Sequence, residues 1–257
     1  MAEKALQAVG TASLIGRRTS QEDFCFTIQR EDGVRIIGVF DGHGGSAFAQ
    51  YAAGHLETVF GSLPISEIGE QTIKRLFAEL HQFHTEPESG TTAILVVQID
   101  KRLICAWVGD SRCLLVKQNG ILQLTTDHRL SNETEKKRIV ETSYFGHEYT
   151  QPVVSNSQYR YVWSLKGDRL MVTRALGDQS FNEVGVSAEP EIVFYDLEDG
   201  DVLCLAVTDG VWGAVDDQEI IKLTSQSSSA GNIAECLVKA ALQNGSKDNV
   251  TAAVCMF

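Results

Sequence analysis

The 257-residue sequence is short of positive charge, with 22 lysine and arginine residues against 34 aspartate and glutamate residues and a formal net charge of −12. Nucleic-acid-binding surfaces need a basic stripe to neutralise phosphates, so we expect no nucleic-acid partner. Most of the acids are expected to serve solubility, whereas a few clustered carboxylates could hold cations. The length and a hydrophobic content of 43% suit one soluble globular domain, residues 1–257.

Long hydrophobic runs are also missing. No apolar run approaches the roughly 18 residues that a membrane span needs. The first residues, "MAEKALQAVG", contain no apolar core of a secretory signal, and Ala2 excludes N-myristoylation. We therefore expect no membrane attachment and a cytoplasmic or nuclear location.

The six cysteines include no CxxC pair, and most of them stand in apolar runs such as "LICAWV" and "VLCLAV". A disulfide framework and a cysteine-ligated zinc site are therefore not expected. The pattern is typical of buried free thiols in a reducing compartment.

Short apolar runs bounded by glycine and aspartate predict eight β-strands, at residues 24–29, 34–40, 92–99, 103–109, 112–118, 191–197, 201–207 and 250–257. Three connections are too short for a helical crossover. They are residues 100–102, 110–111 and 198–200, and we expect each to close an antiparallel hairpin.

Helical periodicity marks other segments, at residues 46–60, 66–83 and 232–245, with shorter candidates at 132–141 and 216–223. Strand runs interleaved with helices predict an α+β sandwich in which helices cover an antiparallel β core. No internal repeat or linker divides the chain.

Three acids stand at the ends of predicted strands. Asp41 and Asp209 each follow an apolar run and precede a glycine, and Asp248 stands just before the last strand. An Asp-Gly pair alone is more often a turn, but an acid at the lip of a buried strand is costly without a cation or partner. Carboxylates without cysteine ligands suit Mg²⁺ or Mn²⁺, and two such ions can activate a water molecule to attack phosphorus.

Charged residues near the N-terminus fit phosphoester chemistry. Arg18 can grip a phosphate through two parallel hydrogen bonds, and Glu22 and Asp23 can order waters around metal ions. His43 follows Asp41 by two residues and can protonate a leaving alkoxide. Each of these residues alone would be read as a solvated or structural group.

Eight motifs in one order resemble the metal-dependent protein phosphatases of type 2C. They are "RRTSQEDFCF", "GVFDGHGG", "SGTTA", "AWVGDSR", "LTTDH", "VTRALGD", "AVTDGVWGAV" and "GSKDNVTAAV". One motif alone would be weak, but together they cover nearly the whole chain.

The resemblance implies a four-layer α-β-β-α sandwich, two metal ions in a cleft at one end, and hydrolysis of phosphoserine and phosphothreonine in proteins. It implies metal binding by Asp41, the Gly42 carbonyl, Asp209 and Asp248. It implies phosphate binding by Arg18, general acid catalysis by His43, and support of metal-bound water by Glu22 and Asp23. In some members the acid at the position of Asp110 helps to bind a third ion.

The sequence departs from the family pattern at two places. Many members carry an aspartate four residues after the acid of the "TDG" motif, where this chain has Gly213, which puts the third ion in doubt. In the variable flap, roughly residues 129–168, the glycine-rich turn that usually follows the helix is replaced by a segment rich in aromatic residues. We expect either that Tyr149, Tyr159 and Trp163 read the substrate, or that they only pack the flap onto the body.

Phosphorylated proteins are the expected partners, and the chain is expected to be a monomer. The alternative is a catalytically weak pseudophosphatase that acts as a binding module, although such a relative should lack the metal carboxylates. A phosphatase with a cysteine nucleophile is excluded, because no cysteine is followed six positions later by arginine. A hydrolase of small phosphate esters would share the same chemical centre.

Overall fold

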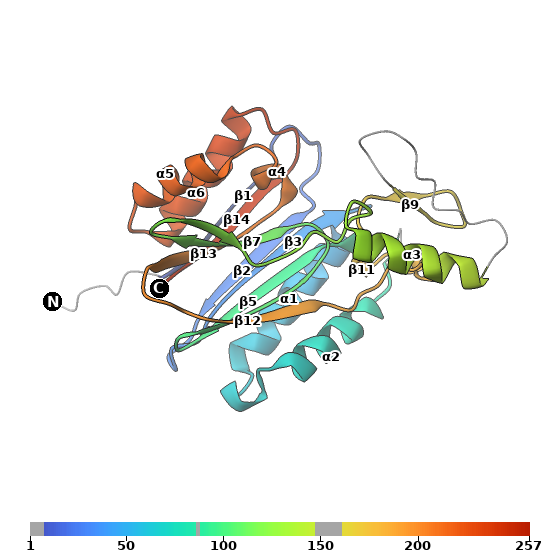
Figure 1. The fold of residues 1–257 in the computed structure, drawn as a ribbon, viewed down its shortest axis with the longest axis horizontal. Helices are drawn as coiled ribbons and strands as arrows, with labels where there is room; N and C mark the ends of the chain where they lie inside the picture. The colour runs from blue at the N-terminus through green and yellow to red at the C-terminus, as the bar shows by residue number, and fades with distance from the viewer. Residues whose placement is uncertain (1–7, 86–87, 147–160) are drawn as a thin grey trace.

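Two antiparallel β-sheets packed face to face form the centre of the computed structural model (Figure 1), which describes residues 8–85, 88–146 and 161–257. The larger sheet has the order β11-β4-β3-β5-β6-β12, with β2 paired to β3, and the smaller has the order β1-β14-β13-β7-β8. A short hairpin, β9–β10, stands apart. The strands are β1 (Val9–Leu14), β2 (Asp23–Gln29), β3 (Arg35–His43), β4 (Gly90–Thr91), β5 (Ala93–Ile99), β6 (Arg102–Val108), β7 (Arg112–Lys117), β8 (Gly120–Gln123), β9 (Val162–Trp163), β10 (Arg169–Leu170), β11 (Leu176–Gly177), β12 (Glu191–Asp196), β13 (Asp201–Val207) and β14 (Val250–Met256).

Helices cover both outer faces of this sandwich, which confirms the predicted α+β architecture (Figure 1). On the larger sheet lie α1 (Ala47–Ser62) and α2 (Glu70–His81), and on the smaller lie α4 (Asp209–Trp212), α5 (Asp217–Ser225) and α6 (Ala230–Gln243). The remaining helices are α3 (Glu133–Gly146) and the 3₁₀ turns η1 (Ile65–Glu67) and η2 (Gln179–Val184). In the described part of the chain, no helix has the length and apolarity to cross a bilayer.

Strand β3 shows why the central runs are apolar at almost every position. Ile36 and Phe40 join the core formed with α1 and α2, whereas Ile37 and Val39 join the core between the sheets. Alternate side chains of a strand point to opposite faces, and here both faces are buried. Gly38 is required beside this core, because a Cβ at that position would lie 2.5 Å from the Phe26 ring.

Two of the three expected hairpins are wrong. The connection at 100–102 does join β5 to β6 within the larger sheet. At 110–111 and 198–200, however, the chain crosses from the larger sheet to the smaller, from β6 to β7 and from β12 to β13. Short turns allow either outcome, and Gly109 (φ +96°) turns the chain away at the first of these corners.

The helix expected at 66–83 is also shorter than predicted. It divides into η1 and α2, because Ile68 and Gly69 have extended backbone that no helix contains. Phe83 lies beyond the end of α2 and stacks on Tyr51 with ring centroids 3.7 Å apart. It therefore still covers α1, although from a loop.

A buried ion-pair network holds the start of α3 to the segment that leads into β11. Both oxygens of Glu135 are engaged, by Arg174 and Arg138 at 2.7 Å each and by the Thr173 hydroxyl at 2.7 Å. Burial alone would raise the pKa of Glu135, but the hydrogen bonds from Arg174, Arg138 and Thr173 hold it well below its usual range.

We predict that Glu135→Gln lowers the free energy of unfolding by about 3–5 kcal/mol at pH 7, because two guanidinium groups lose their buried partner. Because the pKa of Glu135 is lower in the folded protein than in the unfolded chain, its ionised form stabilises the fold at pH values above the unfolded-state pKa of about 4.3. This stabilisation is lost as the pH falls below that value. The difference between the denaturant midpoints should therefore be full at neutral pH and shrink gradually as the pH falls from about 5 toward the low folded-state pKa of Glu135. Glu133→Gln is the control, since Glu133 is exposed in the same helix. Equal effects of the two substitutions would contradict the role of the network.

Candidate functional site

A cavity of about 480 Å³ opens at one end of the sandwich. It lies where β3 ends, where β6 turns into β7, where β13 passes into α4, and where β14 begins. These points are far apart in the sequence but meet at one edge of the two sheets. The predicted site residues that line it are Arg18, Glu22, Asp41, Gly42, His43, Asp110, Asp209 and Asp248.

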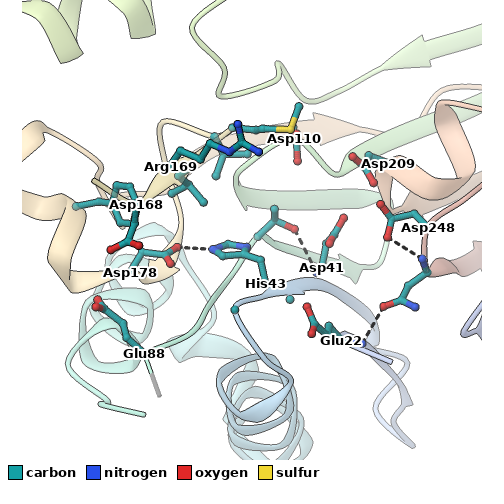
Figure 2. Close-up of a pocket in the computed structure, with 18 of the residues that line it drawn as sticks. Glu22, Asp41, His43, Glu88, Asp110, Asp168, Arg169, Asp178, Asp209 and Asp248 are labelled. Atoms are coloured by element: carbon teal, nitrogen blue, oxygen red, sulfur yellow. Dashed lines mark hydrogen bonds and ion pairs between the residues drawn. The ribbon is translucent and has the colours of Figure 1, made fainter. Parts of the chain in front are cut away.

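The last three residues of β3 bring Asp41, Gly42 and His43 to the cavity. Strand β3 runs past the predicted end at residue 40, because Gly42 and His43 pair with β4. A Cβ on Gly42 would lie 2.3 Å from the Glu22 carbonyl oxygen, so glycine is needed for the chains to approach. Figure 2 shows Asp41 and His43 side by side in the middle of the site.

Glu22 and Asp23 differ in their access to the cavity. Glu22 lines it, and the Glu22 backbone N–H donates to Asn249 Oδ1 at 2.9 Å. Asp23 is buried behind the cavity, faces Asp41 across the β2–β3 pair, and accepts a hydrogen bond from Thr208 at 3.1 Å. Asp23 could therefore act on the cavity through Asp41 or a water.

The second and third predicted carboxylates enter from the smaller sheet. Asp209 begins α4 directly after β13, and Gly210 is required there because a Cβ would lie 2.0 Å from the Asn249 carbonyl oxygen. Asp248 precedes β14 and pairs with Arg18, whose Nη2 lies 2.6 Å from Asp248 Oδ2. The predicted phosphate-binding arginine thus stands beside a predicted metal-binding acid.

Two contributors to the site were missed by the sequence reasoning. Asp178 lies 2.6 Å from His43 Nε2, and Gly90 leaves the space for this carboxylate, since a Cβ there would lie 2.1 Å from Asp178 Oδ2. Arg129 contacts Asp110 through Nε and Nη2. Both residues stand in or beside matched motifs, "VTRALGD" and "LTTDH", but nothing in those motifs names their partners.

Burial, together with the charges of neighbouring carboxylates, raises the pKa of three acids in the site. Burial, Asp23 and Asp209 raise the pKa of Asp41 well above its usual range. Burial, Asp110 and Asp248 raise the pKa of Asp209 to about 6, and burial raises that of Asp23 to about 7 against hydrogen bonds from Thr251 and Thr208. Such crowding of acids indicates a shortage of positive charge, which divalent cations with a preference for oxygen would remedy. The donor set therefore fits Mg²⁺ or Mn²⁺.

His43 responds in the opposite direction. Burial lowers the pKa of this imidazole, but the charge and hydrogen bond of Asp178 outweigh that effect and raise it. A raised pKa favours the protonated form, which is the form that a general acid needs.

The carboxylate oxygens of the cavity are not gathered around one point as the ligands of a bound ion are. Among the residues that the structure describes, three ligand-type side chains with all ligand atoms within 4.8 Å of one another occur elsewhere, at His128, Glu135 and Glu191. The two acids of that group already have a cationic partner, because Arg174 binds both Glu135 and Glu191, at 2.7 and 3.3 Å. The fit to metal ions at the cavity therefore depends on donor chemistry and charge.

Of the aromatic residues expected to read a substrate, Trp163 is described, whereas Tyr149 and Tyr159 lie outside the described residues. Trp163 stands on β9 with 38% of its surface exposed, and it pairs with Arg169 of β10, which lines the cavity. Its ring is thus neither buried in the body of the protein nor part of the cavity wall.

Comparisons with known proteins identify the family of the chain. The family model described as protein phosphatase 2C matches residues 8–250. The chain is 30% identical to probable protein phosphatase 2C 71 of Arabidopsis thaliana, over 96% of this chain and 55% of that protein. It is 30% identical to mitochondrial protein phosphatase 1K of Xenopus laevis, over 98% of this chain and 68% of that protein.

Solved structures share the fold. A Caenorhabditis elegans sex-determining protein superposes with a TM-score of 0.79 at 27% identity, over 99% of this chain and 65% of that chain. Serine-threonine phosphatase 2C from Toxoplasma gondii superposes with a TM-score of 0.78 at 19% identity, over 97% of this chain and 94% of that chain. The chain spans about half the length of the first Arabidopsis relative. With a family model that covers residues 8–250 and two sheets in the arrangement of these neighbours, the chain belongs to the protein phosphatase 2C family.

Proposed function

We propose that this chain hydrolyses phosphoserine and phosphothreonine in proteins with the help of two Mg²⁺ or Mn²⁺ ions. The observation that carries the proposal is the convergence of Asp41, Asp209 and Asp248 on one cavity, together with Arg18 and His43. The alternative, a binding module without activity, has no observation in its favour. Phosphorylated proteins as partners, a monomeric state and a cytoplasmic or nuclear location remain predictions.

The metal-binding residues would be Asp41, the Gly42 carbonyl, Asp209 and Asp248. When bound, the ions would supply the Lewis acidity that makes a water nucleophilic at neutral pH. Glu22 and Asp23 would accept hydrogen bonds from waters in the cavity and hold them in place.

The remaining groups act on the phosphate ester itself. Arg18 uses one N–H in its contact with Asp248 and has further N–H groups for phosphate oxygens. His43, held by Asp178, would donate a proton to the serine or threonine oxygen as the P–O bond breaks. An alkoxide is a poor leaving group, so this proton is needed more for a phosphoprotein than for an aryl phosphate.

The proposed function predicts that activity strictly requires a divalent metal ion. Phosphate release from a phosphopeptide panel should need millimolar Mg²⁺ or Mn²⁺ and stop on addition of EDTA. Asp209→Asn should lower kcat by more than about 100-fold, because even groups behind a metal ligand contribute 10–100-fold. Asp199→Asn is the matched control, an exposed acid in the turn between β12 and β13. A rate of phosphate release by Asp209→Asn near that of the wild type would contradict the proposal.

A second prediction concerns the pair His43 and Asp178. His43→Ala should slow phosphopeptide hydrolysis by about 10²–10⁴-fold and affect p-nitrophenyl phosphate much less, since nitrophenolate leaves without a proton. Asp178→Asn should show the same selectivity to a smaller degree, because the imidazole remains but loses its charged partner. Uniform slowing of both substrates would rule out the acid role.

A third prediction separates recognition from packing at Trp163. If this ring contacts substrate, Trp163→Ala should reduce kcat/KM for a phosphoprotein and leave p-nitrophenyl phosphate unchanged. Phe194→Ala provides the comparison, since Phe194 is also an exposed aromatic residue but stands on β12, whereas Trp163 pairs with the cavity-lining Arg169. Loss of activity by the same factor on both substrates would assign Trp163 to packing of the flap.

A further inference from the structure

The half of the cavity that faces the sheets has a definite charge balance. Five carboxylates line it, those of Glu22, Asp41, Asp110, Asp209 and Asp248, with the buried Asp23 behind Asp41 and the two guanidinium groups of Arg18 and Arg129. When all of them are ionised, an excess of four negative charges remains, which two divalent cations would neutralise. Figure 2 shows Asp110 and Asp209 on the side of the site away from Glu88, Asp168 and Asp178.

Arg129 lies between two of these acids. Its guanidinium contacts Asp110, whose side chain is 6% exposed, and its Nη2 also lies 3.5 Å from Asp209 Oδ2. The same guanidinium stands 5.3 Å from the centre of the Trp212 ring, whose indole N–H donates to the Asp110 carbonyl oxygen at 3.0 Å. A planar, permanently charged group is thus held by two carboxylates and an aromatic face.

The backbone around Arg129 is fixed as well. Arg129 forms a β-bridge with Val172, and the preceding His128 exchanges hydrogen bonds with Gly109, at 2.9 Å to its carbonyl and 3.1 Å from its N–H. Gly109 immediately precedes Asp110. The segments that carry the arginine and its carboxylate partner are therefore joined by one main-chain hydrogen bond and one to the His128 ring, independently of the ion pair.

The residue that caps the C-terminal end of α4 offers no competing ligand. Gly213 stands one helical turn after Asp209 and carries no side chain. A cation between Asp110 and Asp209 would therefore meet two carboxylates that Arg129 already contacts.

We propose that the Arg129 guanidinium is a built-in cation that fills the space between Asp110 and Asp209, so that the cavity takes two divalent ions and not three. Asp110 is then the partner of Arg129 and not a metal ligand. This inference rests on the proposed function, because it assumes that the other carboxylates hold ions. Arg129 acts as a positioning residue, since it orients one oxygen of Asp209.

The test counts bound Mn²⁺ per chain by equilibrium dialysis at millimolar Mn²⁺, with metal analysis and electron paramagnetic resonance of the free ion. The wild type should bind two ions, and Arg129→Met should bind three, because removal of the guanidinium frees Asp110 and the Asp209 oxygen that faced Arg129. Arg169→Met is the matched control, since Arg169 lines the same cavity without contacting Asp110 or Asp209. Arg169→Met should keep two ions. Arg129→Lys should also keep two because it retains the positive charge, and Asp110→Asn should keep two because Asp110 is not a metal ligand.

Three results would overturn the inference: a third ion in the wild type, loss of an ion in Asp110→Asn, or no gain in a folded Arg129→Met. If circular dichroism shows that Arg129→Met is unfolded, the counts in the wild type and in Asp110→Asn decide the question. A wild type that binds two ions and releases phosphate from a phosphopeptide, beside an Arg129→Met that gains none, would refute this inference alone. A wild type that neither binds ions nor releases phosphate would refute the proposed function as well.

Discussion

Mutual repulsion among buried carboxylates is the constraint around which this structure is arranged. Asp23, Asp41 and Asp209 share one end of the sandwich, and each has a raised pKa because burial and the others' charges disfavour ionisation. A flexible loop would relieve such repulsion by moving apart. Strands anchored in two packed sheets cannot do so, and the rigid core therefore keeps the acids crowded at one cavity.

Glycines and arginines make this crowding possible in different ways. Gly42, Gly90 and Gly210 leave space where a Cβ would meet a carbonyl or carboxylate oxygen at 2.0–2.3 Å. Arg18 and Arg129 bring fixed positive charge to individual acids and leave the rest unbalanced. The two kinds of residue together set how many acids approach and how much negative charge remains for an external ion.

Much of the fold could be predicted from the sequence because its signals are local. The strands of both sheets that carry long apolar runs were predicted within one to three residues at their ends, and the strand-end acids Asp41 and Asp209 do line the cavity. Strands β1 and β8 were missed, since most of their residues are only partly buried and show no clear alternation. The two-residue strands β4, β9, β10 and β11 were missed because they are too short to show a pattern. The contact of His43 with Asp178 was out of reach, because it joins residues 135 positions apart and only the folded chain brings them together.

The wrongly predicted turns reveal where fold and function meet. A turn of two or three residues obeys the same local chemistry whether it returns to the same sheet or crosses to the other. At Gly109–Ser111 the chain crosses, and that corner places Asp110 at the junction of the two sheets, where it meets Arg129 and lies near Asp209. A hairpin within one sheet would have kept Asp110 at the edge of the larger sheet, away from the strand that delivers Asp209. The choice between the two is made by tertiary packing of the whole sandwich, so the site depends on long-range contacts that a local reading of the turn does not contain.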